Sequence, residues 1–484
     1  MTRDSTCTQV DVADDDWNPL ISELQVAKLL SEVKPNKFSG DPEISSLIYK
    51  TLSVFISSPL AHIFQACINQ RKIPEEWKKV SITPVPKEKP IKVTKLRPIS
   101  QSLLPTKIFE RILLNELRLN FEHMYGEEQH GFRRECSTTT ALVAITHQLL
   151  QNHDDKNCHG SVLMTFDMHR AFDNLDHKLI IEKFLKMSVP KGFVLLLKDY
   201  LYNRFAHIKL FDKISRSFRV TVGVPQGTVL APYIFGAFFG DFHCLLPTTK
   251  SVKYADDLTV IVPVQSVDKI ENEVNCEIEN IQRWCSENRL TLNLSKSKIL
   301  FCFANNNVEF SFSLPIECVD KVTVLGFVIN KDLSWDSHID HIVKIANRRF
   351  YALRKLWLHL NTDELHMIYT AYIRTIVEYA CPIFAGINKS LTKRLKSIDI
   401  RAHKIIYRDG IRECRCASDE LIIRRNQQSI DLYRKIESSD SHILSDIIPN
   451  RLLHTGYPII PLCRTIKTKQ SFVNYTARLQ SNLL

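Results

Sequence analysis

The residues Lys253-Tyr-Ala-Asp-Asp-Leu-Thr-Val260 place two adjacent carboxylates between apolar runs. This pattern is typical of a β-hairpin whose tight turn carries the polar pair, here Asp256 and Asp257. An Asp-Asp pair in a turn is, taken alone, most often an ordinary solvated turn. The function of the pair can therefore be inferred only together with the segments that precede it.

Two segments upstream of the pair carry related signals. The segment Thr165-Phe-Asp-Met-His-Arg-Ala-Phe-Asp173 follows an apolar run from Ser161, so Asp167 is predicted to close a strand just before a helix. The segment Gly223-Val-Pro-Gln-Gly-Thr-Val-Leu-Ala-Pro232 is a glycine-rich loop that leads into an apolar helix. Each segment alone has an ordinary explanation, such as a helix N-cap or a turn, but few such explanations require all three in this order.

The combination suits phosphoryl transfer. Two Mg²⁺ ions about 4 Å apart can neutralise a triphosphate, activate the attacking hydroxyl and hold it in line. Mg²⁺ takes hard oxygen ligands, and carboxylates at a strand end and at a neighbouring hairpin tip supply them from a rigid sheet. The pattern therefore indicates a two-metal site.

The three segments resemble motifs A, B and C of reverse transcriptases. Their residues are similar to those of the same motifs in the polymerases of non-LTR retrotransposons of the jockey and CR1 type. Similar segments continue in order over residues 20–410. They are Pro86-Lys87, Leu96-Arg-Pro-Ile-Ser100, Gln129-His-Gly-Phe-Arg133, Leu292-Asn-Leu-Ser-Lys296, Leu325-Gly326 with Trp335, and the thumb-region pattern from Tyr369 to Pro382.

The resemblance assigns catalytic roles residue by residue. It implies that Asp167 and Asp256 ligate the two Mg²⁺ ions, for which Mn²⁺ is a possible substitute, and that Asp257 supports them. It also makes Lys296 the candidate general acid for the leaving pyrophosphate. A Lys-x-Lys pattern on an exposed strand is, without the resemblance, more often a solvated sheet edge.

The resemblance also implies a dNTP site. Lys87 and Arg97 would grip the triphosphate, and the ring of Phe172 would leave no room for a 2′-hydroxyl. Gln226 and Gly227 would let the backbone approach the nascent base pair, where a Cβ would intrude. Without the resemblance, the two cations would be solvated loop charges and Phe172 an ordinary core residue.

Further residues are expected to bind the RNA template and the DNA primer. Gln129 and Arg133 belong to one of the similar segments, and a helix from Ile342 carries an apolar stripe opposite a row of cations. In a polymerase this helix belongs to the thumb, whose cations contact the phosphates of the hybrid duplex without reading its sequence. The cations are Lys344, Arg348, Arg349 and Lys355.

Charge and composition agree with a polyanion as partner. The net charge is +11, and from residue 342 onward 24 Lys and Arg stand against 12 Asp and Glu. The longest apolar run, Val229 to Gly240, is about half the ~20 residues that a membrane span needs. The 13 cysteines are scattered and no signal peptide precedes them. We therefore expect a soluble intracellular protein without a membrane partner, nuclear at its site of action.

The alternation of helical and strand patterns predicts an α+β fold, and the resemblance makes it a right-hand polymerase with fingers, a palm containing an antiparallel sheet, and a helical thumb. We expect an N-terminal helical extension (1–79), fingers and palm (80–335), the thumb (336–420) and a basic C-terminal tail (421–484).

The expected function is RNA-directed DNA polymerisation, with an RNA template, a DNA primer and dNTPs. An inactive retroelement remnant that only binds nucleic acid is the main alternative. RNA-dependent RNA synthesis is disfavoured by Phe172, and a maturase or telomerase-like host enzyme would require additional RNA-binding domains. Too few residues precede Ile21 for a nuclease fold, so we expect endonuclease activity to be supplied elsewhere.

Overall fold

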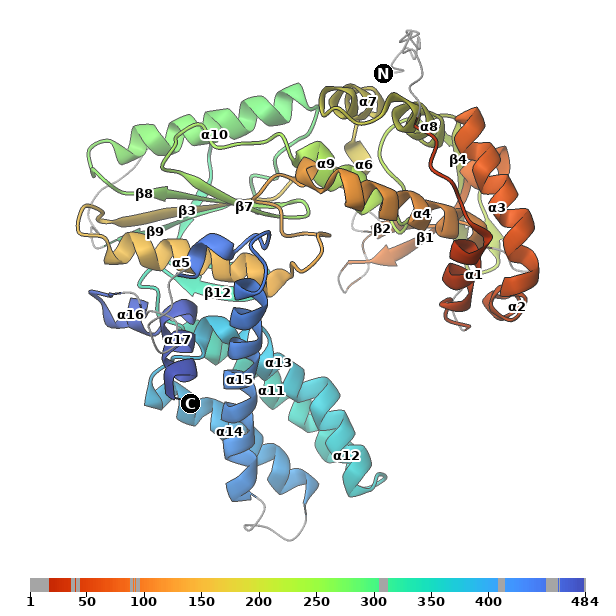
Figure 1. Cartoon of the computed structure of the whole chain (residues 1–484). Coiled ribbons are helices and arrows are strands. Elements are labelled where there is room, and N and C mark those ends of the chain that lie inside the picture. The colour runs from red at the N-terminus through yellow and green to blue at the C-terminus, as the bar shows by residue number, and fades with distance from the viewer. Residues whose placement is uncertain are drawn as a thin grey trace. The chain divides into compact units, whose positions relative to one another are not determined.

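The protein is described by a computed structural model covering residues 17–35, 40, 44–87, 90, 92, 96–303, 312–407, 414–449, 460 and 462–482. The chain divides into two compact units, and each unit takes several separate segments of the chain. The first unit comprises residues 1–126, 169–242 and 284–291. The second comprises residues 127–168, 243–283 and 292–484. Figure 1 follows the chain through both units by colour.

The first unit is mainly helical. Ser22 caps its first helix by accepting a hydrogen bond from the Gln25 N–H at 3.1 Å. An aromatic group, in which the Phe64 ring stacks on Phe109 and meets Trp77 edge-on, lies in its core. The helices are α1 (Glu23–Ser31), α2 (Ser46–Thr51), α3 (Ser53–Gln70), η1 (Glu75–Lys78), α4 (Leu104–Asn120), η3 (Glu122–Tyr125), α6 (Ala171–Asn174), α7 (His177–Lys186), α8 (Lys191–Leu201) and α9 (Ala231–Phe239).

A small sheet completes the first unit. Its strands are β1 (Lys79–Pro86), β2 (Leu96–Gln101), β4 (Arg204–Leu210), β5 (Lys213–Ile214) and β6 (Phe218–Val220). The order is β2-β1-β4-β5, with β6 also on β4, and β1 runs antiparallel to β2 but parallel to β4. The β1–β2 pairing places Pro86 opposite Leu96, and so brings the backbone next to Lys87 close to that next to Arg97.

The second unit contains the sheet that carries the predicted catalytic residues. Its strands are β3 (Gly160–Phe166), β7 (Lys250–Tyr254), β8 (Asp257–Pro263), β9 (Lys298–Phe303) and β10 (Glu317–Val319), in the order β10-β9-β3-β8-β7. All neighbours are antiparallel except β10 and β9. The prediction of a hairpin around Asp256 and Asp257 is confirmed by the β7–β8 pairing.

The central strands of this sheet are apolar on both faces because helices cover both faces. Figure 1 shows α10 (Ile270–Glu287) along one face and α5 (Thr138–Asp154) along the other. Val162, Leu163 and Met164 are consecutive residues of β3, and each is completely buried. The strands of a sheet that is covered on both faces appear in the sequence as continuous apolar runs, not as alternating apolar and polar residues.

A short hairpin follows the sheet. Its strands are β11 (Lys321–Val324) and β12 (Phe327–Asn330), joined by Leu325 and Gly326 with φ of 48° and 80°. Two positive φ values in a two-residue turn match the right-handed twist of the flanking strands. The Tyr379 hydroxyl donates a hydrogen bond to the Leu325 carbonyl at 2.5 Å, which fastens the turn to the helices that follow.

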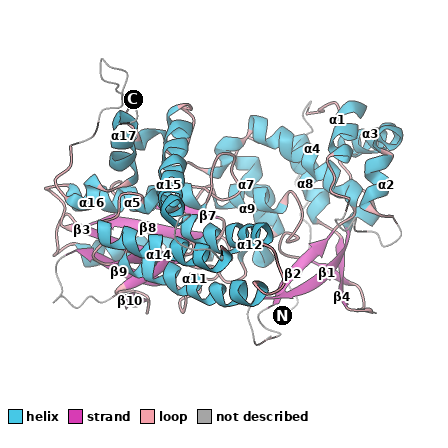
Figure 2. Cartoon of the chain, turned by 90° about the horizontal axis from the view of Figure 1, so that it is seen from below, coloured by secondary structure: helices cyan, strands magenta, loops and turns pink. Residues whose placement is uncertain are grey.

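The region expected to be the thumb is helical. It contains α11 (Asp336–Leu356), α12 (Thr362–Tyr369), the π-helix η4 (Thr370–Arg374), α13 (Thr375–Glu378), η5 (Cys381–Phe384) and α14 (Lys389–Ile406). Figures 1 and 2 show α11 beside α14. The apolar stripe of α11 is buried at Ile342, Ala346, Phe350 and Leu353, and it joins the core that α5 and the sheet form.

The segment expected to be a basic tail is folded wherever the structure describes it. Its first helix, α15 (Cys414–Glu437), begins before the expected boundary at residue 421, and η6 (Ser445–Ile447), α16 (Ile466–Lys469) and α17 (Phe472–Asn482) follow. Tyr433 and Phe472 belong to the same hydrophobic core as α5. At the end of α5, the Asp154 carboxylate accepts hydrogen bonds from the backbone N–H groups of Arg464 and Thr465 at 3.0 and 2.7 Å.

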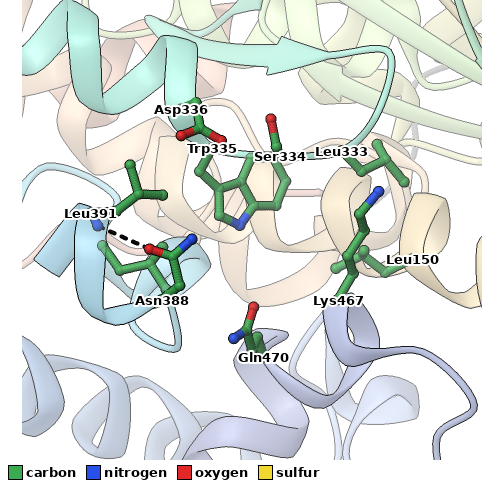
Figure 3. A pocket seen from close by; sticks show the side chains of 10 residues that line it. Leu150, Leu333, Ser334, Trp335, Asp336, Asn388, Leu391, Lys467 and Gln470 are labelled. Carbon is green, nitrogen blue, oxygen red and sulfur yellow. Dashed lines mark hydrogen bonds between the residues drawn. The ribbon is translucent and has the colours of Figure 1, made fainter.

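A cavity of about 150 Å³ lies where this C-terminal segment meets α5 and α14. Figure 3 shows the Trp335 indole at its edge, with Lys467 and Gln470 contributed by the C-terminal segment. The predicted site residues are absent from its lining within the described part of the chain. Among the helices that the structure describes, none is long and apolar enough to span a bilayer.

Candidate active site

The predicted catalytic carboxylates lie at the same end of two paired strands. Asp167 directly follows Phe166, the last residue of β3, and Phe166 is paired with Leu258 of β8. Asp257 begins β8 and is paired with Tyr254, so that Asp256 occupies the turn between β7 and β8. The register of a single buried sheet therefore brings the three carboxylates into one neighbourhood.

Two polar side chains from the segment before β9 bind the Asp167 carboxylate. The Lys296 ammonium lies 3.0 Å from Oδ2 and 3.3 Å from Oδ1, and the Asn293 amide donates to Oδ2 at 2.8 Å. The Asn293 N–H also donates to the Asp167 carbonyl at 2.8 Å. Lys296 lies in the turn before β9, and β9 has a neighbouring strand on each side, so the alternative explanation of a solvated sheet edge does not apply here.

The electrostatics of the turn favour a bound cation. Asp257 is exposed as a residue, but its carboxyl is crowded by surrounding protein atoms, and this desolvation raises its pKa to about 6. The negative charges of Asp256 and Asp167 raise the pKa further, and the Lys296 ammonium opposes them. A carboxylate with a raised pKa beside two others is one that a divalent cation would stabilise.

The arrangement of the three carboxylates stops short of a complete metal centre. Within the described residues, no set of three or more His, Cys, Asp and Glu side chains is positioned to hold a metal ion. The donor set fits Mg²⁺ in kind, because all three groups are hard oxygen ligands. The Lys296 ammonium and the Asn293 amide hold the Asp167 oxygens that would face the cation.

We expect Asp257→Asn to raise the melting temperature of the metal-free protein by a few degrees at pH 8 but not at pH 4. The folded-state pKa of Asp257 is about 6, above the value of about 3.9 in an unfolded chain. Its charge therefore costs stability above pH 6, and the cost is lost as the pH falls below about 4, where both states are protonated.

Scanning calorimetry in EDTA at the two pH values measures this difference. Asp212→Asn, the same change at an exposed turn of the first unit, controls for the altered net charge. An equal gain at both pH values would contradict the expectation, as would a gain at pH 8 no larger than that of the control.

The first unit holds the predicted dNTP residues. Arg97 is paired with Val85 across the β1–β2 hairpin, and Lys87 follows the last residue of β1. Both side chains are exposed. The charge of Lys87 acts on Asp173, where burial raises the pKa of the carboxyl and the Gln226 hydrogen bond, Arg170 and Lys87 lower it.

The glycine-rich loop is packed between the β1–β2 hairpin and the α6 segment. The Gln226 amide donates to the Asp173 carboxylate at 2.7 Å, and the Gln226 carbonyl accepts from the Ser100 N–H at 2.6 Å. Gly227 has a φ of 99°, and a Cβ there would lie 3.0 Å from the Ser100 carbonyl oxygen. Glycine is therefore required at this position by both backbone conformation and space.

The Phe172 side chain is held firmly and remains partly accessible. Its ring stacks on Phe235 of α9, with centroids 4.5 Å apart and planes inclined by 20°. Its carbonyl accepts a hydrogen bond from the Val224 N–H at 2.9 Å. A ring fixed on its face and at its backbone can form one rigid wall of a site.

The structure assigns Gln129 a different environment from the one predicted. Its side chain is completely buried and bonds to the backbone of the catalytic turn, so the expectation of a direct nucleic-acid contact is corrected. Burial could not be foreseen because its partner, Ala255, lies 126 positions later in the chain. Arg133 is half-buried.

The predicted thumb cations lie on the partly exposed side of α11. Lys344, Arg348 and Lys355 are exposed, whereas Arg349 is half-buried. The Arg349 guanidinium stacks 4.2 Å from the Tyr372 ring and donates a hydrogen bond to the Tyr372 carbonyl. Part of the Arg349 guanidinium is therefore engaged in contacts within the protein.

Three polar residues of the site region were assigned no role from the sequence. Asn293 binds Asp167, and Asp173 binds Gln226. Glu110, on α4, is buried and accepts hydrogen bonds from backbone N–H groups of the glycine-rich loop. For Glu110, the sequence carried one signal of a special role: it is a charged residue on the apolar face of a helix, beside Phe109 and Leu113.

Comparison with known proteins identifies the class. Residues 85–329, about half of the chain, match the family described as "Reverse transcriptase (RNA-dependent DNA polymerase)". The chain belongs to the reverse transcriptase family, which confirms the predicted α+β right-hand polymerase fold. Enzymes of this family use divalent metal ions.

The curated relatives are polymerases of mobile elements, which confirms the resemblance to the jockey type. The probable RNA-directed DNA polymerase from transposon BS of Drosophila melanogaster is 25% identical over 413 residues, covering 80% of this chain and 45% of the relative. The RNA-directed DNA polymerase from mobile element jockey of the same species is 24% identical over 400 residues, covering 78% and 43%. The chain thus spans less than half the length of these relatives.

Among solved structures, the telomerase from Candida tropicalis in complex with a fragment of telomeric RNA is similar with a TM-score of 0.40 and 14% identity. The similarity covers 83% of this chain and 68% of that one.

Proposed function

We propose that this chain is an RNA-directed DNA polymerase of a non-LTR retrotransposon, which adds dNTPs to the 3′-hydroxyl of a DNA primer on an RNA template. The observation that carries the proposal is the set of three carboxylates at adjoining ends of β3 and β8, in a member of the reverse transcriptase family. The proposed site of action is the nucleus, where the DNA target would be found.

The proposed metal ligands are Asp167 and Asp256, with Asp257 in support. Two Mg²⁺ ions, or Mn²⁺ in their place, would supply charge neutralisation and an activated primer hydroxyl. The buried sheet holds the carboxylates in place, so little reorganisation would be needed when the nucleotide arrives. A cation at this position would offset the negative charges of Asp256 and Asp167, which contribute to the raised pKa of Asp257.

Lys296 has two successive roles in this proposal. Without a cation, its ammonium neutralises Asp167 at 3.0 Å. The ammonium is exposed and mounted on a turn, so the Lys296 side chain would be able to leave Asp167 when that carboxylate binds a metal ion. A released ammonium could then donate a proton to the leaving pyrophosphate.

The first unit supplies the proposed nucleotide contacts. Lys87 and Arg97 would bind the triphosphate as a point charge and as a bidentate donor. The Phe172 ring, backed by Phe235, would exclude a 2′-hydroxyl by its bulk. Gly227 would bring backbone close to the nascent base pair.

The cations of α11 would bind the phosphates of the RNA–DNA hybrid. Lys344, Arg348 and Lys355 are exposed on one helix, and Arg349 is partly tied to Tyr372. Contacts of this kind weaken steeply with salt and do not depend on base sequence. Arg133 is proposed as a further contact with the template.

Primer extension on poly(rA)/oligo(dT) with dTTP tests the proposal. We expect the purified chain to extend the primer with Mg²⁺ and not in EDTA. We also expect dTTP to be preferred over UTP by about 10²-fold or more, since a steric clash of about 3 kcal/mol gives this ratio. A folded chain that binds the hybrid but extends no primer would instead support the inactive remnant that only binds nucleic acid.

A further inference from the structure

A short segment of the second unit, residues 128–131, runs along the outer side of β7. The Lys253 N–H donates to the Glu128 carbonyl at 2.8 Å, and the His130 N–H donates to the Lys253 carbonyl at 2.8 Å. Gln129 and Lys253 thereby form an isolated parallel bridge. The segment extends the sheet by one partial strand next to the turn that carries Asp256 and Asp257.

The Gln129 side chain binds both polar backbone groups of the residue before the catalytic pair. Its Oε1 accepts hydrogen bonds from the Ala255 N–H at 3.1 Å and the Gly131 N–H at 2.8 Å. Its Nε2 donates to the Ala255 carbonyl at 3.4 Å. Gln129 is completely buried, so these bonds form where water does not compete.

The turn and the segment touch backbone to backbone. A Cβ on Gly131 would lie 2.3 Å from the Ala255 nitrogen, so glycine is needed for this approach. Ala255 has a φ of 56°, a conformation that costs an L-residue about 1 kcal/mol or more. Such strain persists only where surrounding contacts determine the backbone, and Gln129 supplies those contacts on both sides of the residue.

The segment is itself anchored at two points. The Lys253 side chain is fully buried, and its ammonium lies 3.5 Å from Glu128 Oε2. The His130 ring Nδ1 lies 3.0 Å from the Thr140 hydroxyl, and Thr140 belongs to the capping box that begins α5. The position of Ala255 is thus linked through Gln129 and the neighbouring His130 to the first turn of α5.

We propose that Gln129 is a positioning residue for catalysis, which holds the backbone of the turn before Asp256 and Asp257 and so restricts where their carboxylates can lie when they bind Mg²⁺. The inference rests on the proposed function and deepens it. Mg²⁺ demands nearly ideal octahedral geometry, so a small displacement of a carboxylate lowers its affinity. Residues that orient metal ligands change metal affinity or activity by about 10- to 100-fold when replaced.

The test compares Gln129→Met with Gln428→Met in the full chain. Methionine keeps the length of glutamine and removes its hydrogen bonds. Gln428 is a half-buried control on α15, where it accepts a hydrogen bond from the Cys381 thiol at 3.0 Å and donates to Glu378 at 3.2 Å. Three quantities are measured: primer extension as a function of Mg²⁺ concentration, hybrid affinity by fluorescence anisotropy, and the rise in melting temperature on adding Mg²⁺ without nucleic acid.

For Gln129→Met we expect kcat to fall at least about tenfold, the half-saturating Mg²⁺ concentration to rise, and the stabilisation by Mg²⁺ to shrink. Hybrid affinity should stay within about twofold of wild type, since a fully buried side chain makes no phosphate contact. Gln428→Met should change neither the Mg²⁺ dependence nor kcat.

Two results would overturn the proposal. A weakened hybrid affinity that accounts for the whole loss of activity would make Gln129 a nucleic-acid contact. An unchanged Mg²⁺ dependence, with a loss of melting temperature equal to that of Gln428→Met, would make it a purely structural residue. If the wild type extends no primer, the proposed function fails, and the Mg²⁺-induced rise in melting temperature still decides: an equal rise in both proteins, or none in either, refutes the role of Gln129.

Discussion

Replacing Asp256 and Asp257 together by asparagine is expected to reduce primer extension on poly(rA)/oligo(dT) by at least about 10³-fold. Asp256 lies in the turn between β7 and β8 and Asp257 begins β8, and their charges would balance the metal ions that stabilise the transition state by several kcal/mol. A loss of about 4 kcal/mol corresponds to this ratio, since each 1.36 kcal/mol is tenfold in rate. Single-turnover extension with dTTP measures the effect directly.

The asparagine variant is a sharp test because it should fold at least as well as the wild type. Asparagine has nearly the shape of aspartate, and its neutral amide removes the repulsion that contributes to the raised pKa of Asp257. Its melting temperature in EDTA should therefore equal or exceed that of the wild type. Equal extension by both proteins would reject the assigned metal site and indicate a contaminating polymerase in both preparations.

Glu110→Ala is expected to lower the free energy of unfolding by about 3–5 kcal/mol, the range found when one partner of a buried ionic network is removed. Glu110 Oε2 accepts from the Val229 N–H at 2.6 Å, and Oε1 accepts from the Tyr200 hydroxyl at 2.9 Å. Burial raises the pKa of this carboxyl, while the bonds from Tyr200 and Val229 and the charge of buried Arg204 lower it. Alanine would leave these donors without an acceptor.

Urea denaturation followed by fluorescence measures the loss, and Glu110→Gln is the matched control. The glutamine carbonyl can still accept from the Val229 N–H, so its loss should be clearly smaller than that of alanine. A loss below about 1 kcal/mol for alanine, which is what an ordinary hydrogen bond contributes, would contradict the assigned role. The result bears on function as well, because Val229 lies in the glycine-rich loop that holds Gln226 and Gly227.

The parts of the site that were predictable from the sequence are those whose structure is local. The Asp256-Asp257 hairpin and the strand before Asp167 are specified by apolar runs a few residues long, and the β3 and β7–β8 strands follow them closely. The proposed dNTP residues belong to a single hairpin, with Lys87 directly after β1 and Arg97 in β2. Their roles came from resemblance to a family and remain proposals.

The parts that were missed depend on partners far along the chain. Gln129 was expected at a nucleic-acid surface, yet a partner 126 positions later buries it. The backbone N–H groups that donate hydrogen bonds to Glu110 belong to residues 119 and 120 positions later in the chain. Periodicity shows which face of a helix is apolar, but it does not show which polar side chain will find a buried backbone group.

The C-terminal segment was the least predictable part. α16 has only four residues, too few to be stable as an isolated helix, and its position comes from tertiary contacts. The Thr468 hydroxyl donates to the Leu150 carbonyl at 3.3 Å, and Thr465 binds Asp154. Both partners belong to α5, so the segment became interpretable only when its neighbours in space were known.

The attachment of residues 464–468 to α5 has a consequence for biosynthesis. These bonds join positions 310 to 318 residues apart, so they are contacts of very long sequence separation. Ribosomes add about 5–20 residues per second, which separates the synthesis of α5 from that of its last partners by about 15–60 s. During this interval the nascent chain exposes part of the apolar core that these residues cover later, and exposed apolar surface favours aggregation. The core that α5 shares with the C-terminal helices is therefore completed only after the ribosome has passed the codons for this segment.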